Sequence, residues 1–216
     1  MIISFTGPDG TGKTTLAKLL ARRYLLQNYN VHYIRFKSHH LGMYLILKLL
    51  ILLKIIPKTN SPRILDYYLF QIFGYKTLFF ILELVNSLLW LLLNVKLVPL
   101  ITRKKIIIAE RYIPDFIVSI LFIRPKVNTL IYSLKIFSLF MKNSFNILLL
   151  AYPRDILKRK PDEQLETNYI YLLTCLYSLV ISYIGANVII NTSLMDAPMS
   201  FYKIQKGLEY SYQGRV

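Results

Sequence analysis

One short stretch constrains the fold of this chain more than any other. It is "GPDGTGKTT" at residues 7–15, which directly follows the apolar run "MIISF". The stretch fits the pattern G-x-x-x-x-G-K-[ST], in which glycines let successive backbone N–H groups converge on an anion. Its fixed positions are Gly7, Gly12, Lys13 and Thr14. The pattern therefore predicts a phosphate-binding loop, which Gly10, Thr11 and Thr15 complete.

The residues on either side supply the context that such a loop requires. Residues 1–6 are apolar enough for a buried strand, and residues 13–27 place leucines at helical spacing. These leucines are Leu16, Leu19, Leu20 and Leu25. In such a loop Lys13 reaches the β- and γ-phosphates of ATP, and the Thr14 hydroxyl ligates Mg²⁺. A plain strand-to-helix turn is the alternative that this context argues against.

Short apolar segments alternate with helical stretches along the whole chain. The candidate strands are residues 1–6, 31–36, 105–109, 146–151 and 187–191. Each is a continuous apolar run rather than an alternating one, as expected of parallel strands buried on both faces. Helical connections between such strands imply right-handed crossovers. The sequence thus predicts an α/β fold of the P-loop NTPase type, with a doubly wound, five-stranded parallel sheet flanked by helices, in a single domain over residues 1–216.

The charge balance is strongly basic, with 27 Lys and Arg against 11 Asp and Glu and a formal net charge of +16. A field of this sign attracts nucleotides, nucleic acid and anionic membranes alike. The 17 tyrosines are spread along the helices without an RNA-binding motif, so specific nucleic-acid binding is not expected. The single cysteine, Cys175, excludes an internal disulfide framework and lies in an apolar helix pattern, where a core position is expected. We expect a cytoplasmic protein and leave association with the membrane surface open.

Apolar residues are concentrated between the second and third strands, in a predicted helical acceptor region at about 41–101. Within it, residues 78–101 exceed the roughly 20 residues that span a bilayer. Their polar side chains fall on one narrow stripe of an α-helix. These are Glu83, Asn86, Ser87 and Asn94. The helix then packs in the core, or contacts a second subunit or a membrane surface, and a homodimer is expected. A transmembrane span is disfavoured, because both flanking strands must stay in one sheet.

A second group of polar residues follows the third strand. "KIIIAERY" at residues 105–112 ends a buried strand with Glu110 and Arg111. In P-loop enzymes a carboxylate on a strand beside the loop often lies near Mg²⁺. An arginine just beyond it is placed to bind a phosphate through two parallel hydrogen bonds. We therefore expect Glu110 and Thr14 to hold the metal; an ordinary exposed Glu–Arg pair is the alternative.

Together these stretches resemble the thymidylate kinase family of nucleoside monophosphate kinases. The loop matches the family's G-x-D-G-x-G-K-T-T, and "ERY" at 110–112 is similar to its Asp-Arg-Tyr motif, with Glu in place of Asp. "YIRFKSHHLG", "LLLAYPRDILKRK" and "VIINTS" follow in the family's order. The resemblance implies transfer of the γ-phosphoryl group of ATP, with Mg²⁺, to a dTMP-like nucleoside monophosphate.

The resemblance also implies roles for single residues on the acceptor side. Asp9 would hold a sugar hydroxyl of the acceptor or help position its phosphate, and Arg111 would grip that phosphate. Arg35 and Phe36 would hold the acceptor, with Phe36 against the base, and Tyr112 belongs to the same motif as Arg111. Lys13 would bridge the donor and acceptor phosphates.

On the ATP side, the resemblance implies a lid at about 154–164 that supplies cations to the phosphates. The candidates are Arg154, Lys158, Arg159 and Lys160. Arg159 is assigned to catalysis and Arg154 to ATP binding, although spacing cannot select one cation. Thr192, in "VIINTS", would border the adenine.

The sequence departs from the family in the acceptor half. Where the family has Ser and then Ala-Tyr-Gln, with the Gln contacting thymine, this chain has Asp115, Val118, Ser119 and Ile120. Gly74 stands where the family has a phosphate-binding Arg. Specificity for dTMP therefore does not follow. Two alternatives remain open: a P-loop kinase with a different, apolar or membrane-associated acceptor, and an ATP-binding protein without kinase turnover.

Overall fold

The computed structural model is described over residues 1–35, 48–49, 51–54, 84–85, 87–101, 106–123, 126–141, 144–161 and 167–213. Phe36, Gly74 and most of the predicted apolar region at 41–83 lie outside these residues, as does the second part of the predicted lid, 162–164.

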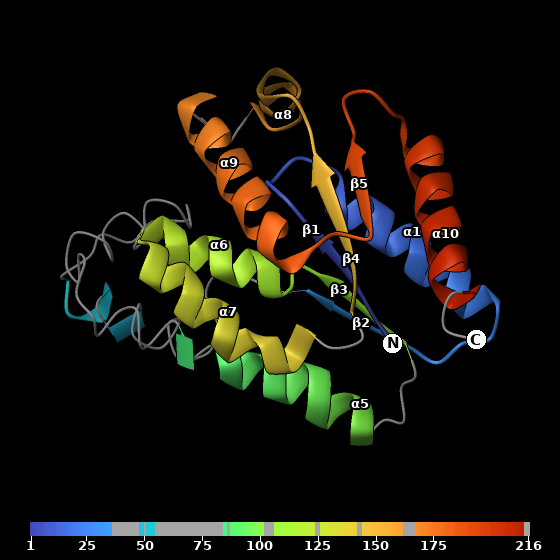
Figure 1. Cartoon of the computed structure of the whole chain (residues 1–216), viewed down its shortest axis with the longest axis horizontal. Coiled ribbons are helices and arrows are strands. Elements are labelled where there is room, and N and C mark those ends of the chain that lie inside the picture. Colours follow the sequence, from blue (N-terminus) through green and yellow to red (C-terminus); the bar gives the residue numbers. More distant parts are fainter. Residues whose placement is uncertain are drawn as a thin grey trace.

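The centre of the molecule is a five-stranded parallel sheet, as predicted (Figure 1). The strands are β1 (Ile2–Thr6), β2 (Val31–Arg35), β3 (Ile106–Glu110), β4 (Ser144–Leu150) and β5 (Val188–Asn191). Their order in the sheet is β2-β3-β1-β4-β5. The predicted strands therefore all exist, with boundaries that differ by one or two residues. The expected burial on both faces holds for the central strands, and every residue of β3 is buried. The edge strands β2 and β5 are only partly buried.

The register brings the carboxyl ends of three strands together. Phe5 pairs with Glu110 of β3 and with Ile147 of β4, so the residues after β1 and β3 emerge side by side. The strands β2 and β3 lie on one side of β1, and the later strands β4 and β5 lie on the other side. This reversal of strand order is the topological switch point at which open α/β sheets bind ligands.

Helices cover both faces of the sheet (Figure 1). One face carries α1 (Lys13–Leu26) and α10 (Ala197–Gln213). The other carries α6 (Ile113–Ile123), α7 (Val127–Met141) and α9 (Thr167–Ile184). The short helix α8 (Pro153–Arg159) lies above the carboxyl end of β4, where Pro153 occupies its first turn and has no N–H to leave unpaired.

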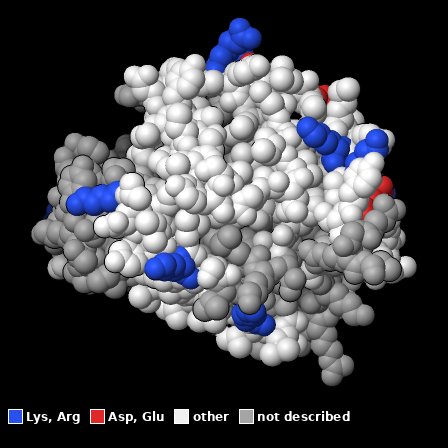
Figure 2. Space-filling view, viewed as in Figure 1, with Lys and Arg blue, Asp and Glu red and all other residues white. Residues whose placement is uncertain are grey.

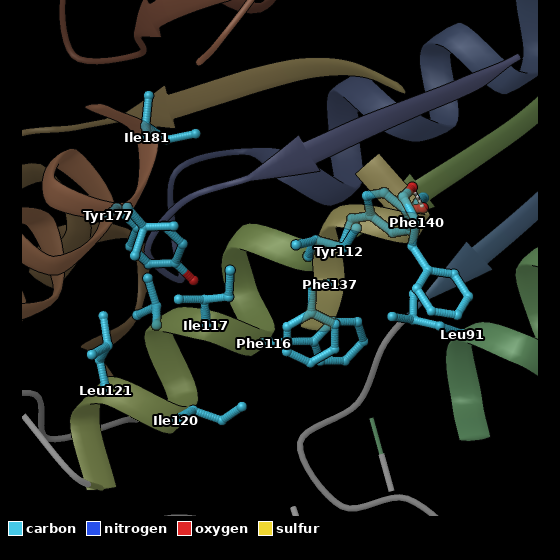
Figure 3. Packing of buried hydrophobic residues seen from close by; sticks show 14 of the residues in the cluster. Leu91, Tyr112, Phe116, Ile117, Ile120, Leu121, Phe137, Phe140, Tyr177 and Ile181 are labelled. Atoms are coloured by element: carbon cyan, nitrogen blue, oxygen red, sulfur yellow. Dashed lines mark hydrogen bonds between the residues drawn. The ribbon is translucent and has the colours of Figure 1, made fainter. Parts of the chain in front are cut away.

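Each face has its own hydrophobic core. Under α1 and α10 the core contains Ile3, Phe5 and Leu20. Under α6, α7 and α9 it is aromatic, and Figure 3 shows Phe116 stacked on Phe137, with ring centroids 5.9 Å apart. Trp90 meets the edge of Phe116 at 5.8 Å. These interlocking rings fix α6, and with it the turn that precedes α6.

The described part of the apolar region differs from the regular helix that the stripe assumed. Residues Leu92–Leu97 form a π-helical segment, η1, which continues as α5 (Val98–Ile101). The Val98 N–H donates to the Leu93 carbonyl, five residues back. Pro99 lacks an N–H and its ring would crowd the carbonyl four residues earlier, which accounts for the wider turn.

Of the four residues of the polar stripe, Ser87 and Asn94 are described, whereas Glu83 and Asn86 lie outside the described residues. Ser87 is fully buried, and the Asn94 side chain donates to the Trp90 carbonyl at 3.1 Å. Leu91 between them is fully buried in the core, whereas Leu89, Leu92 and Leu93 face outward and are 45 to 55% exposed. In this stretch Ser87 thus packs inward together with Leu91 and Val95, while other leucines form much of the surface.

One smaller expectation was wrong. Cys175 was expected in the core, yet it lies on the exposed face of α9. Apolar periodicity locates a helix but does not show which of its apolar faces is covered.

Candidate active site

The loop of residues 7–15 has a backbone that only glycine adopts readily. Gly7, Gly10 and Gly12 all have positive φ, at 137°, 85° and 85°. A Cβ on Gly7 would lie 2.0 Å from the carbonyl oxygen of Leu149 in β4, so any side chain there would force the loop off the sheet. Thr11 braces the loop from inside, because its buried hydroxyl donates to the Pro8 carbonyl at 2.8 Å.

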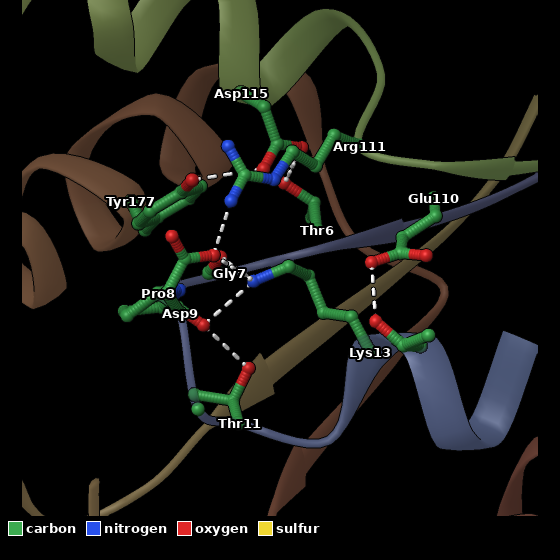
Figure 4. A network of polar contacts seen from close by, with 12 residues as sticks. Thr6, Gly7, Pro8, Asp9, Thr11, Lys13, Glu110, Arg111, Asp115 and Tyr177 are labelled. Carbon is green, nitrogen blue, oxygen red and sulfur yellow. Dashed lines mark hydrogen bonds and ion pairs between the residues drawn. The ribbon is translucent and has the colours of Figure 1, made fainter. Parts of the chain in front are cut away.

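Lys13 opens α1 and folds back into the loop (Figure 4). Its Nζ donates to the carbonyl oxygens of Gly7 at 2.6 Å and Pro8 at 2.7 Å, and lies 3.3 Å from Oδ1 of Asp9. The side chain is only 4% exposed. Burial lowers the pKa of Lys13, while the charge of Asp9 acts against this. The ammonium is thus held at the centre of the loop by neutral acceptors and one carboxylate.

Thr14 and Glu110, the two predicted metal ligands, meet directly. The Thr14 hydroxyl donates to Oε1 of Glu110 at 2.5 Å. The other carboxylate oxygen accepts from the Tyr33 hydroxyl at 2.6 Å, and the Arg35 Nε lies 3.3 Å from Oε1. Mg²⁺ in nucleotide sites takes one or two protein oxygens and fills the rest of its shell with phosphates and water. The pair of oxygens fits that requirement.

Arg111 sits in a strained turn that points it at the loop. Its φ is +68°, a conformation uncommon for residues other than glycine, and its N–H continues the ladder by donating to the Phe5 carbonyl at 2.9 Å. The guanidinium forms an ion pair with Oδ1 of Asp9, the oxygen that Lys13 also approaches. Burial alone would raise the pKa of Asp9, but the charges of Lys13 and Arg111 outweigh it and hold this pKa well below its usual range.

Asp115 holds this turn from behind, and sequence reasoning noted it only as a departure from the family. It is 3% exposed and accepts three hydrogen bonds. The donors are the Thr6 hydroxyl at 2.6 Å, the Tyr112 N–H at 3.1 Å and the Tyr177 hydroxyl at 2.8 Å. Burial raises the pKa of Asp115, against the influence of Lys13 and Arg111. One carboxylate thus ties the end of β1, the start of α6 and the middle of α9 together (Figure 4).

Two further residues were not found from the sequence. Tyr177 lies 62 residues from Asp115 in an apolar helix, and no local pattern distinguishes it from the other tyrosines. Tyr33 reads as a strand residue, yet its hydroxyl orients Glu110. An acid four residues after Arg111, at the start of a strongly apolar helix, was the one available signal for Asp115.

A pocket of about 280 Å³ opens on the other side of the loop. Its lining includes Gly10, Gly12, Thr15, Arg159, Thr192 and Ser200. Arg159 closes one wall, donating to the Gly10 carbonyl at 3.1 Å and to the Thr192 hydroxyl and carbonyl at 2.9 and 2.7 Å. The pocket therefore joins the loop, the end of α8 and the residues after β5.

Three other predicted site residues, Arg154, Lys160 and Tyr112, lie less closely against the phosphate-binding loop and its pocket. Arg154 is 79% exposed on α8 and pairs only loosely with its neighbour Asp155, at 3.9 Å. The Lys160 chain passes the loop, with its Cδ 3.6 Å from where a Cβ on Gly10 would lie. Tyr112 was expected among the substrate contacts, but its side chain is fully buried and donates to the Phe140 carbonyl at 2.7 Å, so it is closed to a ligand.

Comparison with known proteins agrees with this geometry. The model of the ATPase family associated with various cellular activities (AAA) matches residues 3–67. Among curated proteins no sequence matches the chain. The fold is similar to that of a thymidylate kinase from Ehrlichia chaffeensis, with a TM-score of 0.56 and 18% identity over 96% of this chain and 98% of that one. The chain has a P-loop nucleotide kinase-like fold.

A second structure supports the same assignment. The YorR protein of Bacillus subtilis, crystallised in complex with phosphorylated GDP, matches with a TM-score of 0.53 and 16% identity over 99% of this chain and 98% of that one. The resemblance to thymidylate kinase seen in the sequence motifs is therefore supported by the fold. Sequence identities of 16 to 18% show a shared fold and do not identify the substrate of this chain.

Proposed function

We propose that the protein is an ATP-dependent phosphotransferase that phosphorylates a nucleoside monophosphate, dTMP-like in the simplest case. The observation that carries the proposal is the shared carboxylate of Asp9. Its Oδ1 is approached by Lys13 from the phosphate-binding loop and by Arg111 from the β3–α6 turn. A second cation a few ångströms away, on a separate element, suits an enzyme that aligns two phosphate groups.

The loop would hold the β- and γ-phosphates of ATP through its backbone N–H groups, with Lys13 exchanging carbonyl partners for phosphate oxygens. Thr14 and Glu110 would hold Mg²⁺, which supplies neutralising charge to those phosphates. The pocket beside Arg159 and Thr192 would take the adenine. Arg111 would hold the acceptor phosphate, whose oxygen forms the new bond to the transferred phosphorus as the bond to ADP breaks. Catalysis then comes from alignment and charge stabilisation.

A second candidate keeps the ATP side and changes the acceptor. Val118 and Ile120 are 2% and 1% exposed in the core of α6, at the places where the related family carries its base-reading segment. Neither offers a hydrogen bond to a base. Asp115, at the place of the family's serine, already accepts three hydrogen bonds. These residues favour an acceptor other than dTMP.

A phosphotransfer screen tests both candidates. The purified chain is incubated with labelled Mg·ATP and one acceptor at a time: nucleoside monophosphates, nucleosides and isoprenoid alcohols. Label transfer to dTMP or another monophosphate supports the first candidate, and transfer only to a different class supports the second. ATP binding with no transfer to any acceptor would overturn both.

A further inference from the structure

The two sides of the sheet differ sharply in the charge of their outer surfaces. On α1 and α10 the exposed positions include Lys18, Arg22, Arg23, Lys203 and Lys206. On α6, α7 and α9 the charged residues are Asp115, which is buried, and Lys135. The helix α9 has no charged residue in 18 positions.

The outer face of this layer is apolar and aromatic. On α9 the exposed side chains recur at helical spacing, and Tyr171, Leu172, Leu179 and Tyr183 are 43 to 62% exposed. On α7, Val127, Ile131 and Tyr132 are 43 to 71% exposed. We call these seven residues the apolar face. Figure 2 shows this side as a broad uncharged surface with separate blue cations on and around it.

By length and composition α9 is apolar enough to cross a membrane, and only 22% of it is buried. Its inner face rules out a span in this fold. Tyr177, Val180 and Ile181 pack in the aromatic core, and the Tyr177 hydroxyl bonds to Asp115. Removing α9 from the domain would leave that buried carboxylate short of a donor. The helix can therefore meet a bilayer only with its outer half.

We propose that the apolar face docks on the surface of an anionic membrane. Two observations select this occupant. Lys126 and Lys135 are exposed beside the apolar face, and its described helices expose no carboxylate. Pairing two copies through this face would bring these lysines together without an acid to neutralise them. Anionic headgroups neutralise them directly.

The aromatic composition points the same way. Three of the seven residues are tyrosines, which have an apolar ring and a polar tip and are enriched where a bilayer meets water. Leucines between them would enter the boundary of headgroups and acyl chains, as in helices that lie in the plane of a membrane.

Vesicle co-sedimentation of the full chain tests this surface. We expect binding to vesicles of phosphatidylcholine and phosphatidylserine, weaker binding to phosphatidylcholine alone, and release at 1 M salt, where the Debye length is about 3 Å. Changing Leu172→Glu together with Leu179→Glu should lower binding at least about 10-fold. Leu25→Glu with Leu26→Glu is the matched control, since it adds the same charge on exposed leucines of α1.

A second pair of variants tests the charges without altering the apolar face. Lys126→Gln with Lys135→Gln should lower binding to anionic vesicles roughly 10- to 30-fold, and Lys18→Gln with Lys206→Gln on the opposite side should have a smaller effect. The proposal would be overturned if either double variant on or beside the apolar face lowered vesicle binding no more than its control double variant on the opposite side of the sheet. It would also be overturned by a wild-type chain that ignores anionic vesicles, or by one that is a dimer dissociated by the Leu172→Glu and Leu179→Glu changes. None of these readouts depends on kinase turnover, so the proposed function stands or fails separately.

Discussion

The phosphate-binding loop and the β3–α6 turn both direct a cation at Asp9, but they are built in different ways. The loop depends on backbone: three glycines with positive φ and a lysine held by carbonyl oxygens. The turn depends on side chains: a non-glycine residue with positive φ, held by a buried carboxylate with three donors. The comparison shows that a local sequence motif is enough to build the phosphate-binding loop. The β3–α6 turn, in contrast, needs partners from three elements of the fold.

The largest expected effect is on the loop. Lys13→Ala should lower phosphotransfer by about 10²- to 10³-fold, because it removes the cation nearest the phosphates from a water-poor site. It should also weaken Mg·ATP binding, measured by calorimetry. Lys18→Ala, an exposed lysine on the same helix, is the control. Unchanged ATP affinity and unchanged turnover in the Lys13 variant would contradict the assignment of the loop.

The backbone of the loop can be tested separately. Gly7→Ala should destabilise the protein by roughly 2–4 kcal/mol, since the new Cβ would meet the Leu149 carbonyl oxygen at 2.0 Å in addition to the cost of its φ. Gly12→Ala has a positive φ but no atom within 4 Å of the new Cβ, so about 1–2 kcal/mol is expected. Urea unfolding measures both. Equal losses would show that the close approach to β4 does not matter.

On the turn, Arg111→Ala should reduce phosphotransfer roughly 10- to 150-fold, the loss expected for a charge-assisted contact of about 1.5–3 kcal/mol. ATP affinity should change little, because the loop keeps its own cation. Steady-state kinetics with varied acceptor concentration measures the effect on phosphotransfer, and calorimetry with ATP measures the effect on ATP affinity. Arg22→Ala, at an exposed arginine on the outer face of α1, serves as the control. Equal damage to ATP binding would place Arg111 on the same side as Lys13.

The smallest effect concerns the carboxylate behind the turn. Asp115→Asn should cost about 1–3 kcal/mol, since its amide group would face donors in place of an acceptor. Tyr177→Phe, which removes one of the three donors, should cost about 0.5–1.5 kcal/mol. Thermal and urea unfolding measure both, and Asp155→Asn on the exposed helix α8 is the control. A neutral Asp115→Asn change would show that the turn is held without it.

The pH dependence of that cost has a definite sign. Burial raises the pKa of Asp115 above its unfolded value of 3.8, so its contribution to stability is present below this pH and is lost as the pH rises toward the folded pKa. The difference in unfolding free energy between wild type and Asp115→Asn should therefore shrink as the pH rises above 3.8. Asp9, whose pKa is lowered, should show the opposite: its contribution is present above 3.8 and lost as the pH falls. A cost of Asp115→Asn that grows with pH would contradict the raised pKa.

Much of the fold was predictable because its determinants are local. The five strands are short, mainly apolar segments, and the loop is a fixed spacing of glycine, lysine and threonine next to one of them. The meeting of Thr14 with Glu110 also followed, since parallel strands end at the same edge of a sheet. These features depend on composition and period over a few residues, which a single sequence displays.

What the tertiary structure alone decided involves residues far apart in the chain. Asp115 became the support of the turn only because α6 and α9 pack together and bring Tyr177 to it across 62 residues. Tyr112 was predicted to contact the substrate, but it is buried in the core, where its hydroxyl donates to the Phe140 carbonyl. The sequence determined that α9 is an apolar helix, and only packing decided that half of its apolar surface faces outward. Periodicity is a property of one helix, while burial depends on which neighbour covers it.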